Sequence, residues 1–306
     1  MSESGVVLSS AGGRYRVGLS GSDKVVEASL RGRIKRGSAA QDRVVIGDRV
    51  QVRSTDGSWL VDEVEPRSTA LIRRGRGGKV PRVLAANLDR VFAVVALGEP
   101  VATPELIDRL LVLVEASGMH PILLLNKVDL EGARAAADGF EELYGSLGYE
   151  VVAVSARSGE GLEGLRSACR EGTSALVGPS GVGKSSLLNA LEPALELPTG
   201  ALSRKTGTGR HTTVGSRMIP LVSGGLIADT PGFSDVGLWS VGADEVADCF
   251  PEIAALAEAC RFRGCAHVSE PGCAVKEAVE LGRIAESRFR SFTTLRREAT
   301  EAAQRA

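Results

Sequence analysis

The first 66 residues alternate between apolar and polar side chains in short runs that are separated by Gly, Asp and Ser. In residues 26–35 the apolar residues and glycine occupy the even positions, and polar residues occupy the odd ones. This two-residue period is typical of a half-buried strand, and it recurs over residues 15–19 and 50–52. About five short strands in this span predict a small β-barrel, with the OB-fold as the leading candidate. A generic β-domain is the alternative.

From Asp89 onward the pattern changes to strands that alternate with helices. The continuous apolar run Val91–Leu97 is expected of a strand that is covered on both faces. Thr103 and Pro104 are a typical N-cap and first helical residue, and the helical stripe that follows ends at Gly118. Further strands are expected at residues 122–125, 151–154, 175–177 and 226–228. This alternation predicts a parallel, doubly wound sheet, whose ligands bind at the carboxyl ends of the strands.

The pattern divides the chain into four segments. An OB-fold domain is expected over residues 1–70, and a basic linker over residues 71–84. An α/β domain follows over residues 85–240, and a helical module with a cysteine-rich turn occupies residues 241–306. In the linker, Arg73, Arg74, Arg76, Lys79 and Arg82 alternate with glycine and proline. Such a segment cannot bury a core, so we expect it to be mobile until an anion orders it.

Charge is distributed unevenly between these segments. The net charge of −1 over 306 residues would by itself argue against an anionic partner. Residues 1–82, however, hold 16 basic and 9 acidic side chains, a balance of +7, which leaves −8 for the remainder. Only 4% of the residues are aromatic, too few for the stacking platforms of single-strand binders. Arg31, Arg33 and Lys35, which the alternation places on one face, and the linker arginines instead suggest phosphate contacts and shape recognition.

Composition excludes several other classes of protein. With 43% hydrophobic and 25% charged residues, the chain is neither wholly disordered nor fibrous. Its longest apolar stretch is far shorter than the roughly 20 residues of a membrane span, and the N-terminus lacks the pattern of a secretory signal. A cytoplasmic protein without a membrane partner is therefore expected. In that compartment the five cysteines are free thiols or metal ligands rather than disulfides.

Residues 178–185, GPSGVGKS, match the phosphate-binding loop pattern and lie between an apolar strand and a helix. The glycines let backbone N–H groups surround the α- and β-phosphates at a helix N-terminus. Lys184 is expected to reach the β- and γ-phosphates, and the Ser185 hydroxyl to bind Mg²⁺. A coincidental glycine-rich turn is the alternative. The residues assigned to phosphate binding are Gly178, Pro179, Ser180, Gly181, Val182, Gly183, Lys184, Ser185 and Ser186.

Two motifs at the ends of neighbouring strands indicate which base is bound. Residues 126–129 are Asn126, Lys127, Val128 and Asp129. The Asp129 carboxylate can accept hydrogen bonds from the ring N–H and the amino group of guanine, and adenine has no matching donors. Ser155 and Ala156 end the next strand, where backbone N–H groups can meet the guanine oxygen. A surface loop is the alternative for the tetrapeptide alone, but together the motifs predict guanine.

Asp229-Thr230-Pro231-Gly232 ends the last predicted strand. Asp229 can hold Mg²⁺ through water, and the Gly232 N–H can sense the γ-phosphate. A polar, glycine-rich segment over residues 205–213 resembles a switch loop whose threonine completes the magnesium shell when GTP is present. Either Thr212 or Thr213 can supply that hydroxyl, with a slight preference for Thr213.

The order of these motifs is unusual. GTPases ordinarily run from the phosphate loop through the switch threonine and DxxG to NKxD and SAx. Here NKVD and SAR precede the phosphate loop, and DTPG comes last. This is a circular permutation, which leaves all five motifs at the same end of one sheet.

The residue after the DxxG glycine is Phe233, where many GTPases carry a glutamine that orients the attacking water. Intrinsic hydrolysis is therefore expected to be slow. His211 is the nearest candidate for a catalytic base or hydrogen-bond donor. A loop histidine that touches only phosphate or solvent is an equal alternative.

Cys260, Cys265, His267 and Cys273 offer three thiolates and one imidazole within 14 residues. This is the ligand set of a closed structural zinc site, which would fold a short helical module rather than take part in catalysis. Buried free cysteines are the alternative. Cys249 is a possible substitute ligand, although its helical setting favours a core position, as for Cys169.

Taken together, the chain resembles the ribosome small-subunit-dependent GTPase A family (RsgA, also YjeQ) along essentially its whole length. The resemblance rests on NKVD at 126–129, GPSGVGKSS at 178–186, RHTT at 210–213, DTPGF at 229–233 and CRFRGCAHVSEPGC at 260–273. It implies an OB-fold that contacts ribosomal RNA and GTP hydrolysis to GDP and phosphate that the small ribosomal subunit stimulates late in its maturation. The implied ligands are GTP or GDP, Mg²⁺ and one Zn²⁺, and a monomer is expected.

Three alternatives stay open at this point. The chain can be a binding module that uses GTP only as a conformational ligand, as the absent glutamine suggests. It can be a permuted GTPase that serves the large subunit, although the basic strand domain and the zinc cluster argue against this. A P-loop kinase or ATPase would require NKVD and SAR to be accidents.

Overall fold

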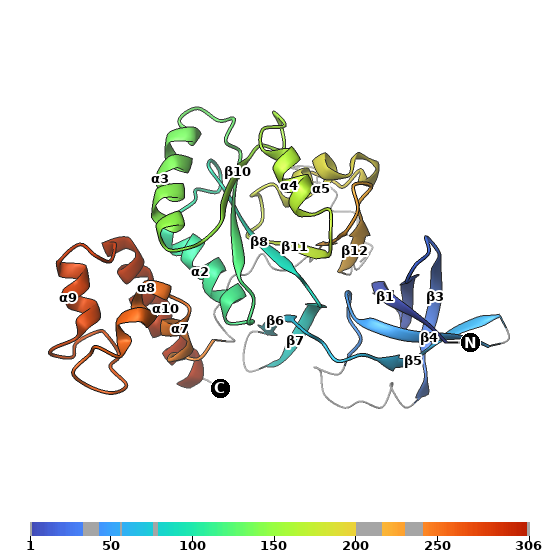
Figure 1. Cartoon of the computed structure of the whole chain (residues 1–306), viewed down its shortest axis with the longest axis horizontal. Coiled ribbons are helices and arrows are strands. Elements are labelled where there is room, and N and C mark those ends of the chain that lie inside the picture. Colours follow the sequence, from blue (N-terminus) through green and yellow to red (C-terminus); the bar gives the residue numbers. More distant parts are fainter. Residues whose placement is uncertain are drawn as a thin grey trace, which may run out of the picture.

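The computed structural model describes residues 2–32, 43–55, 57–75, 79–199, 216–229 and 241–304. These residues form a β-barrel, a central α/β domain and a helical C-terminal module (Figure 1). The barrel and the C-terminal module lie at opposite ends of the molecule, with the α/β domain between them (Figure 1). Among the described residues, none of the helices has the length and apolar character that crossing a bilayer requires.

The barrel consists of β1 (Ser2–Ala11), β2 (Arg14–Leu19), β3 (Val25–Leu30), β4 (Arg49–Thr55) and β5 (Ser58–Val64). The strand order is β1-β2-β3-β5-β4, and pairing of β1 with β4 closes the barrel. Only β3 and β5 run parallel among these pairs. Alternate side chains fill the interior, among them Val7, Val17, Val26, Val50 and Val61. The predicted small barrel is confirmed.

Strand β3 is shorter than its alternating sequence predicts. Its pairing with β5 ends at Leu30 opposite Val61, so Arg31 lies beyond the strand. The Arg31 guanidinium donates to Asp62 at 3.3 Å. The alternating pattern continues to Lys35, but alternation does not reveal where the neighbouring strand stops pairing. Arg33 and Lys35 lie outside the described residues.

The segment predicted as an unpacked linker forms a hairpin. Strands β6 (Ala70–Gly75) and β7 (Lys79–Ala86) pair as a separate two-stranded antiparallel sheet. Leu71 and Ala85, at the open end of this hairpin, are fully buried. Gly47 has φ +83°, and a Cβ there would lie 2.0 Å from the Ala86 carbonyl oxygen, so the barrel chain packs directly against the hairpin. These few apolar residues were hidden in the sequence by the arginines and glycines between them.

The α/β domain contains β8 (Arg90–Ala96), β9 (Pro121–Asn126), β10 (Val151–Val154), β11 (Thr173–Val177), β12 (Arg217–Pro220) and β13 (Leu226–Asp229). Their order is β10-β9-β8-β11-β13-β12. The first five strands in this order run parallel, as predicted, whereas β12 is antiparallel to β13. Strand β12 is only four residues long and was not predicted.

Helices cover both faces of this sheet. Helices α2 (Pro104–Glu115) and α3 (Ala133–Ser146) lie on one face, and α4 (Leu162–Ala168) and α5 (Lys184–Leu191) lie on the other (Figure 1). Helix α2 begins as predicted, because the Thr103 hydroxyl accepts a hydrogen bond from the Leu106 N–H at 3.2 Å. A short 3₁₀ helix, η2 (Pro193–Leu195), follows α5. The sheet is thus doubly wound, with an apolar core on each face.

The C-terminal module contains α7 (Glu245–Asp248), α8 (Pro251–Ala257), α9 (Ala274–Glu280) and α10 (Glu286–Gln304). Helix α10 packs against α2 of the α/β domain. At this contact the fully buried Arg288 binds Asp108 of α2 at 2.5 Å and Glu252 of α8 at 2.7 Å. Nearby, Arg109 of α2 binds both carboxylate oxygens of Glu298. Ion pairs therefore hold the module to the α/β domain.

Candidate functional site

Four sequence motifs meet at one edge of the parallel sheet. Asn126 is the last residue of β9, and Ser155 follows β10. Gly178 follows β11, and Asp229 is the last residue of β13. Because these strands run parallel, their carboxyl ends lie at the same edge, where α/β sheets bind their ligands. Two further parts of the predicted site lie outside the described residues. They are the switch segment with His211, Thr212 and Thr213, and the part of DTPGF after Asp229, with Gly232 and Phe233.

Residues 178–183 form a tight loop that leads from β11 into α5. Gly183 has φ +98° and immediately precedes the helix. A Cβ on Gly178 would lie 2.3 Å from the Val94 carbonyl oxygen, and one on Gly183 would lie 2.3 Å from Asn126 Nδ2. Glycine is therefore required at both positions. The loop leaves the first N–H groups of α5 without partners inside the helix, the arrangement that binds phosphate.

The Lys184 ammonium group is folded back over this loop. It donates hydrogen bonds to the carbonyl oxygens of Gly178 at 2.7 Å and Pro179 at 2.8 Å. Burial lowers the pKa of Lys184 to about 8, while the negative charge of Asp229 acts in the opposite direction. The lysine is thus in place for a phosphate, and it lacks a strong anionic partner of its own among the described residues.

This environment predicts that nucleotide binding takes up a proton. Phosphate charges favour the ammonium form of Lys184, so they raise its pKa above the value of about 8. Affinity for GDP should therefore be constant below pH 8 and decrease as the pH rises above it. Calorimetric titrations of GDP in buffers of different ionisation enthalpy should reveal uptake of about half a proton at pH 8, increasing towards pH 9. Absence of this uptake would contradict the assignment of Lys184 to the phosphates.

The residues predicted to bind guanine also support the phosphate loop. The buried Asn126 side chain donates to the Val182 carbonyl oxygen at 2.8 Å and accepts from the Ala156 N–H at 3.3 Å. The Lys127 ammonium donates to the carbonyl oxygens of Gly181, at 2.9 Å, and Glu99. These contacts connect NKVD to both the phosphate loop and the SAR motif. The two contacts to the phosphate loop could not be found from the motif spacing, because they join residues more than 50 positions apart.

Asp129 is held in place by the neighbouring motif. The buried Ser155 hydroxyl donates to Asp129 Oδ1 at 2.6 Å. The same hydroxyl oxygen accepts hydrogen bonds from the N–H groups of Arg157 at 3.1 Å and Ser158 at 3.0 Å. The motif's sequence predicts a role for its backbone alone. The structure adds a side-chain role for Ser155, which fixes the Asp129 carboxylate at an exposed position where a base can approach.

Ser185 and Asp229 supply the oxygen atoms expected for Mg²⁺. Ser185 lies in the first turn of α5, and Asp229 ends the adjacent strand β13. A hydroxyl and a carboxylate are hard oxygen donors, which magnesium prefers and to which phosphates and waters are usually added. The pair therefore fits a magnesium ion that is bound together with nucleotide. The Asp229 carboxylate is contacted by Arg217, whose Nε lies 3.4 Å from Oδ2.

The four predicted zinc ligands form one cluster. The Sγ atoms of Cys260, Cys265 and Cys273 and a ring nitrogen of His267 all lie within 4.8 Å of one another. His267 Nδ1 is 3.5 Å from Cys260 Sγ and 3.4 Å from Cys273 Sγ, and the two sulfur atoms are 3.9 Å apart. A tetrahedral zinc site has ligand–ligand distances of about 3.5–3.8 Å. The geometry is therefore compatible with zinc.

A carboxylate that was not predicted stabilises the loop between these ligands. Glu270 accepts backbone hydrogen bonds from Ala266 at 2.9 Å, Val268 at 3.1 Å and Ser269 at 3.0 Å. These hydrogen bonds, that from Ala266 foremost, lower the pKa of Glu270 to about 2. Glu270 therefore stays ionised and fixes the turn that carries His267.

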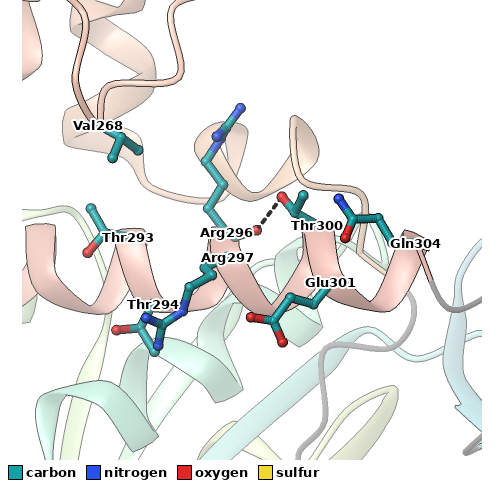
Figure 2. Close-up of a pocket in the computed structure, with 8 residues that line it drawn as sticks. All are labelled: Val268, Thr293, Thr294, Arg296, Arg297, Thr300, Glu301 and Gln304. Carbon is teal, nitrogen blue, oxygen red and sulfur yellow. Dashed lines mark hydrogen bonds between the residues drawn. The ribbon is translucent and has the colours of Figure 1, made fainter.

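A groove of about 430 Å³ lies along α10 beside this loop (Figure 2). Figure 2 shows mostly polar residue types along it, and Thr300 donates to the Arg296 carbonyl oxygen within the helix. Exposed Val268 contributes from the zinc loop, and Arg296 and Arg297 contribute positive charge. None of the described residues of the nucleotide motifs lines this groove. Its lining residues are Val268, Thr293, Thr294, Arg296, Arg297, Thr300, Glu301 and Gln304.

Comparison with known proteins identifies the family. The sequence profile of the family described as RsgA GTPase matches residues 64–239. A relative from Gemmatimonas aurantiaca, named Small ribosomal subunit biogenesis GTPase RsgA, is 44% identical over 301 residues, which cover 97% of each chain. The chain belongs to the RsgA GTPase family. An RsgA relative from Moorella thermoacetica with the same name is 41% identical over 292 residues, which cover 95% of each chain.

Solved RsgA-type structures share the whole architecture. The crystal structure of YjeQ from Thermotoga maritima superposes with a TM-score of 0.81 at 32% identity, covering 98% of this chain and 99% of that chain. The structure of YloQ, described as a circularly permuted GTPase, gives a TM-score of 0.78 at 30% identity and covers 98% and 96%. The protein is therefore a circularly permuted GTPase, a hydrolase whose family implies GTP or GDP and Mg²⁺ as ligands.

Proposed function

We propose that this GTPase acts in the late assembly of the small ribosomal subunit, that it binds ribosomal RNA, and that the subunit stimulates its GTP hydrolysis. The observation that carries this proposal is the full-length similarity to relatives named for small ribosomal subunit biogenesis, which extends over the barrel and the C-terminal module as well as the GTPase domain. A monomer in the cytoplasm, the compartment of bacterial ribosome assembly, completes the proposal.

The geometry of the site supports the following nucleotide contacts. Backbone N–H groups of the phosphate loop, residues 178–186 apart from Pro179, surround the phosphates, and Lys184 releases its two carbonyl partners to contact the β- and γ-phosphates. Asp129, oriented by Ser155, accepts hydrogen bonds from the guanine edge. Ser185 and Asp229 hold Mg²⁺, which supplies positive charge against the phosphates when bound. Asn126, Lys127, Val128 and Ala156 keep the two halves of the site together.

Hydrolysis also needs groups from segments that lie outside the described residues. We propose that Thr213 or Thr212 completes the magnesium shell, that the Gly232 N–H senses the γ-phosphate, and that His211 contacts or activates the attacking water. Phe233 cannot orient water as a glutamine does. Slow intrinsic turnover and a dependence on the ribosomal partner are the consequences.

RNA contact is proposed for the basic surface of the barrel and hairpin. Arg14, Arg16, Arg31, Arg49 and Arg53 are exposed barrel residues. Arginine side chains on a sheet surface with few aromatics suit phosphate contacts and shape recognition rather than base stacking. Arg296 and Arg297 in the groove on α10 offer a second basic surface at the opposite end of the molecule (Figures 1 and 2).

Sedimentation with ribosomal subunits tests the choice of partner. The protein loaded with a non-hydrolysable GTP analogue should co-sediment with purified small subunits and not with large subunits. Because binding depends on phosphate contacts, the bound fraction should decrease as salt is raised. Lys184→Ala, which should not retain the nucleotide, is the matched control and should bind less. Preferential binding to large subunits would instead support a permuted GTPase that serves the large subunit.

We propose that one Zn²⁺ binds Cys260, Cys265, His267 and Cys273 and stabilises the C-terminal module. Replacing Cys265 with serine should reduce the zinc content from about one ion per chain to near zero and unfold the module, since short helices such as α8 and α9 bury little core. Guanine nucleotide binding should persist, because the nucleotide motifs lie in the α/β domain. Zinc analysis and nucleotide titration measure both effects.

Cys249→Ser provides the control for this experiment. Cys249 is buried in the same module but lies outside the four-ligand cluster. Its zinc content should equal that of the parent protein. Equal zinc content in Cys265→Ser and the parent protein would contradict the proposed site.

A further inference from the structure

Arg217 lies where three strands that are far apart in the sequence meet, namely the barrel strand β1, the short strand β12 and the GTPase strand β13. It is the first residue of β12 and is paired with Ser9 of the barrel strand β1. On its other side it is paired with Asp229, the last residue of β13. Through these pairings the barrel and the GTPase sheet form one continuous 11-stranded sheet. Arg217 belongs to none of the recognised nucleotide motifs.

The Arg217 side chain reaches the proposed magnesium ligand. Residues directly opposite each other in an antiparallel pair project to the same face of the sheet. Accordingly, Arg217 Nε lies 3.4 Å from Asp229 Oδ2. The side chains are 36% and 24% exposed, so water screens their attraction only in part. The contact occupies one carboxylate oxygen, and within the described part of the chain no hydrogen bond to the other oxygen is found.

We propose that Arg217 is a positioning residue that holds the Asp229 carboxylate ready for the magnesium shell and couples it to the position of the barrel. This inference rests on the proposed function of Asp229. The barrel strand β1 is paired on both sides within the closed barrel, so it moves with the barrel as a unit. Displacement of the barrel on RNA would shift Ser9, and with it the backbone of Arg217. The orientation of Asp229 would follow.

The dependence of nucleotide affinity on magnesium tests whether Arg217 positions the Asp229 carboxylate for the magnesium shell. The dissociation constant of a fluorescent, non-hydrolysable GTP analogue, mant-GMPPNP, is measured with excess Mg²⁺ and with EDTA. Arg217→Gln should reduce the affinity gained from magnesium by about two- to five-fold, as expected for a partly exposed ion pair. The affinity in EDTA should not change. Arg217→Lys should restore part of the effect, because lysine keeps the charge.

Arg90→Gln is the matched control. Arg90 begins β8, which β11 separates from β13, and it donates to the Glu171 carbonyl oxygen, away from the motifs. In Arg90→Gln, magnesium should increase the affinity for the GTP analogue as much as it does in the parent protein. If magnesium increases the nucleotide affinity of Arg217→Gln as much as that of the parent protein, or more, the inference is overturned. A larger increase would mean that Arg217 competes with the metal. If magnesium does not strengthen binding even in the parent protein, the assignment of Asp229 fails and the inference fails with it.

Hydrogen exchange tests the coupling to the barrel. Adding Mg²⁺ to the mant-GMPPNP complex should change the protection of peptides that contain Ser9 in the parent protein and in Arg90→Gln. In Arg217→Gln this change should be lost. The same change in all three proteins would overturn the coupling, even if the affinity measurements agree with the positioning role.

Discussion

Replacing Asp129 with asparagine is expected to lower the affinity for GTP by about 10²- to 10⁴-fold, because two charge-assisted hydrogen bonds to guanine are lost at about 1.5–3 kcal/mol each. The carboxylate offers only acceptors to the guanine ring N–H and amino group, whereas an amide can turn a donor towards them. The Ser155 hydroxyl, 2.6 Å from Asp129 Oδ1, would hold the substituted side chain in the same place. Preference for GTP over ATP should decrease accordingly. Competition titrations against a fluorescent GDP measure both values.

Asp138→Asn is the control for this variant. Asp138 is an exposed carboxylate on α3 that pairs with Arg134. Removing its charge changes the net charge equally but should leave the GTP affinity unaltered. Guanine selectivity that survives in Asp129→Asn would contradict the assignment of the base site.

The second large effect is expected at the joint between the C-terminal module and the GTPase domain. Arg288→Met should destabilise the contact of α10 with α2 by about 3–5 kcal/mol, the usual cost of leaving buried carboxylates without their partner. Arg288 is 1% exposed and neutralises Asp108 and Glu252, and its guanidinium lies 4.3 Å from the centre of the Phe250 ring. Protection of α10 amides from hydrogen exchange should decrease by about 10²- to 10⁴-fold. Arg290→Met, on the exposed side of α10, should change protection little.

The pH dependence of this variant has a definite sign. Burial raises the pKa of Asp108, and the Arg288 charge opposes that rise. Without Arg288 the pKa of Asp108 should rise further, so the folded variant holds a proton that the unfolded chain releases. The stability of the variant should therefore decrease as the pH rises from the pKa of Asp108 in the unfolded chain towards its higher pKa in the folded variant. Lowering the pH from 7.5 to 5.5 should recover part of the lost protection in Arg288→Met. An equal loss of amide protection at pH 7.5 and at pH 5.5 would mean that Asp108 is not the group left unpaired.

The chemistry-bearing positions were predictable because each is bound to a local pattern. An apolar run followed by a motif places that motif at the carboxyl end of a strand, which holds for Asn126, Ser155, Gly178 and Asp229. The N-cap at Thr103 is equally local. The Cys260–Cys273 cluster combines ligand type and spacing within one turn. In these cases the information needed lies within a few residues of the site.

What the sequence could not provide depends on contacts between distant segments. The open end of the hairpin of β6 and β7 is buried at Leu71 and Ala85, and Gly47 of the barrel chain, more than 20 residues earlier, packs against Ala86 there. The contact of Arg288 with Asp108 joins residues 180 positions apart, and a lone arginine in a helix gives no sign of such a partner. The contact of Arg217 with Asp229 requires β12, a strand too short for its period to be recognised.

Charge also acquires a location in the structure. Arg14, Arg16, Arg31, Arg49 and Arg53 are exposed on the described part of the barrel, and α10, which carries Arg296 and Arg297, lies at the other end of the molecule (Figure 1). The GTPase domain lies between them, connected to the barrel through β12 and to the C-terminal module through α2. Both basic regions are thus connected to elements that lead into the nucleotide site.

The central claim is that the small ribosomal subunit stimulates GTP hydrolysis at this site. Phosphate release from GTP should be measured with the protein alone, with purified small subunits and with purified large subunits, at several salt concentrations. We expect slow turnover for the protein alone, an increase of at least about tenfold with small subunits that weakens as salt rises, and no comparable increase with large subunits. Turnover that small subunits leave unchanged, or that large subunits raise equally, would contradict it.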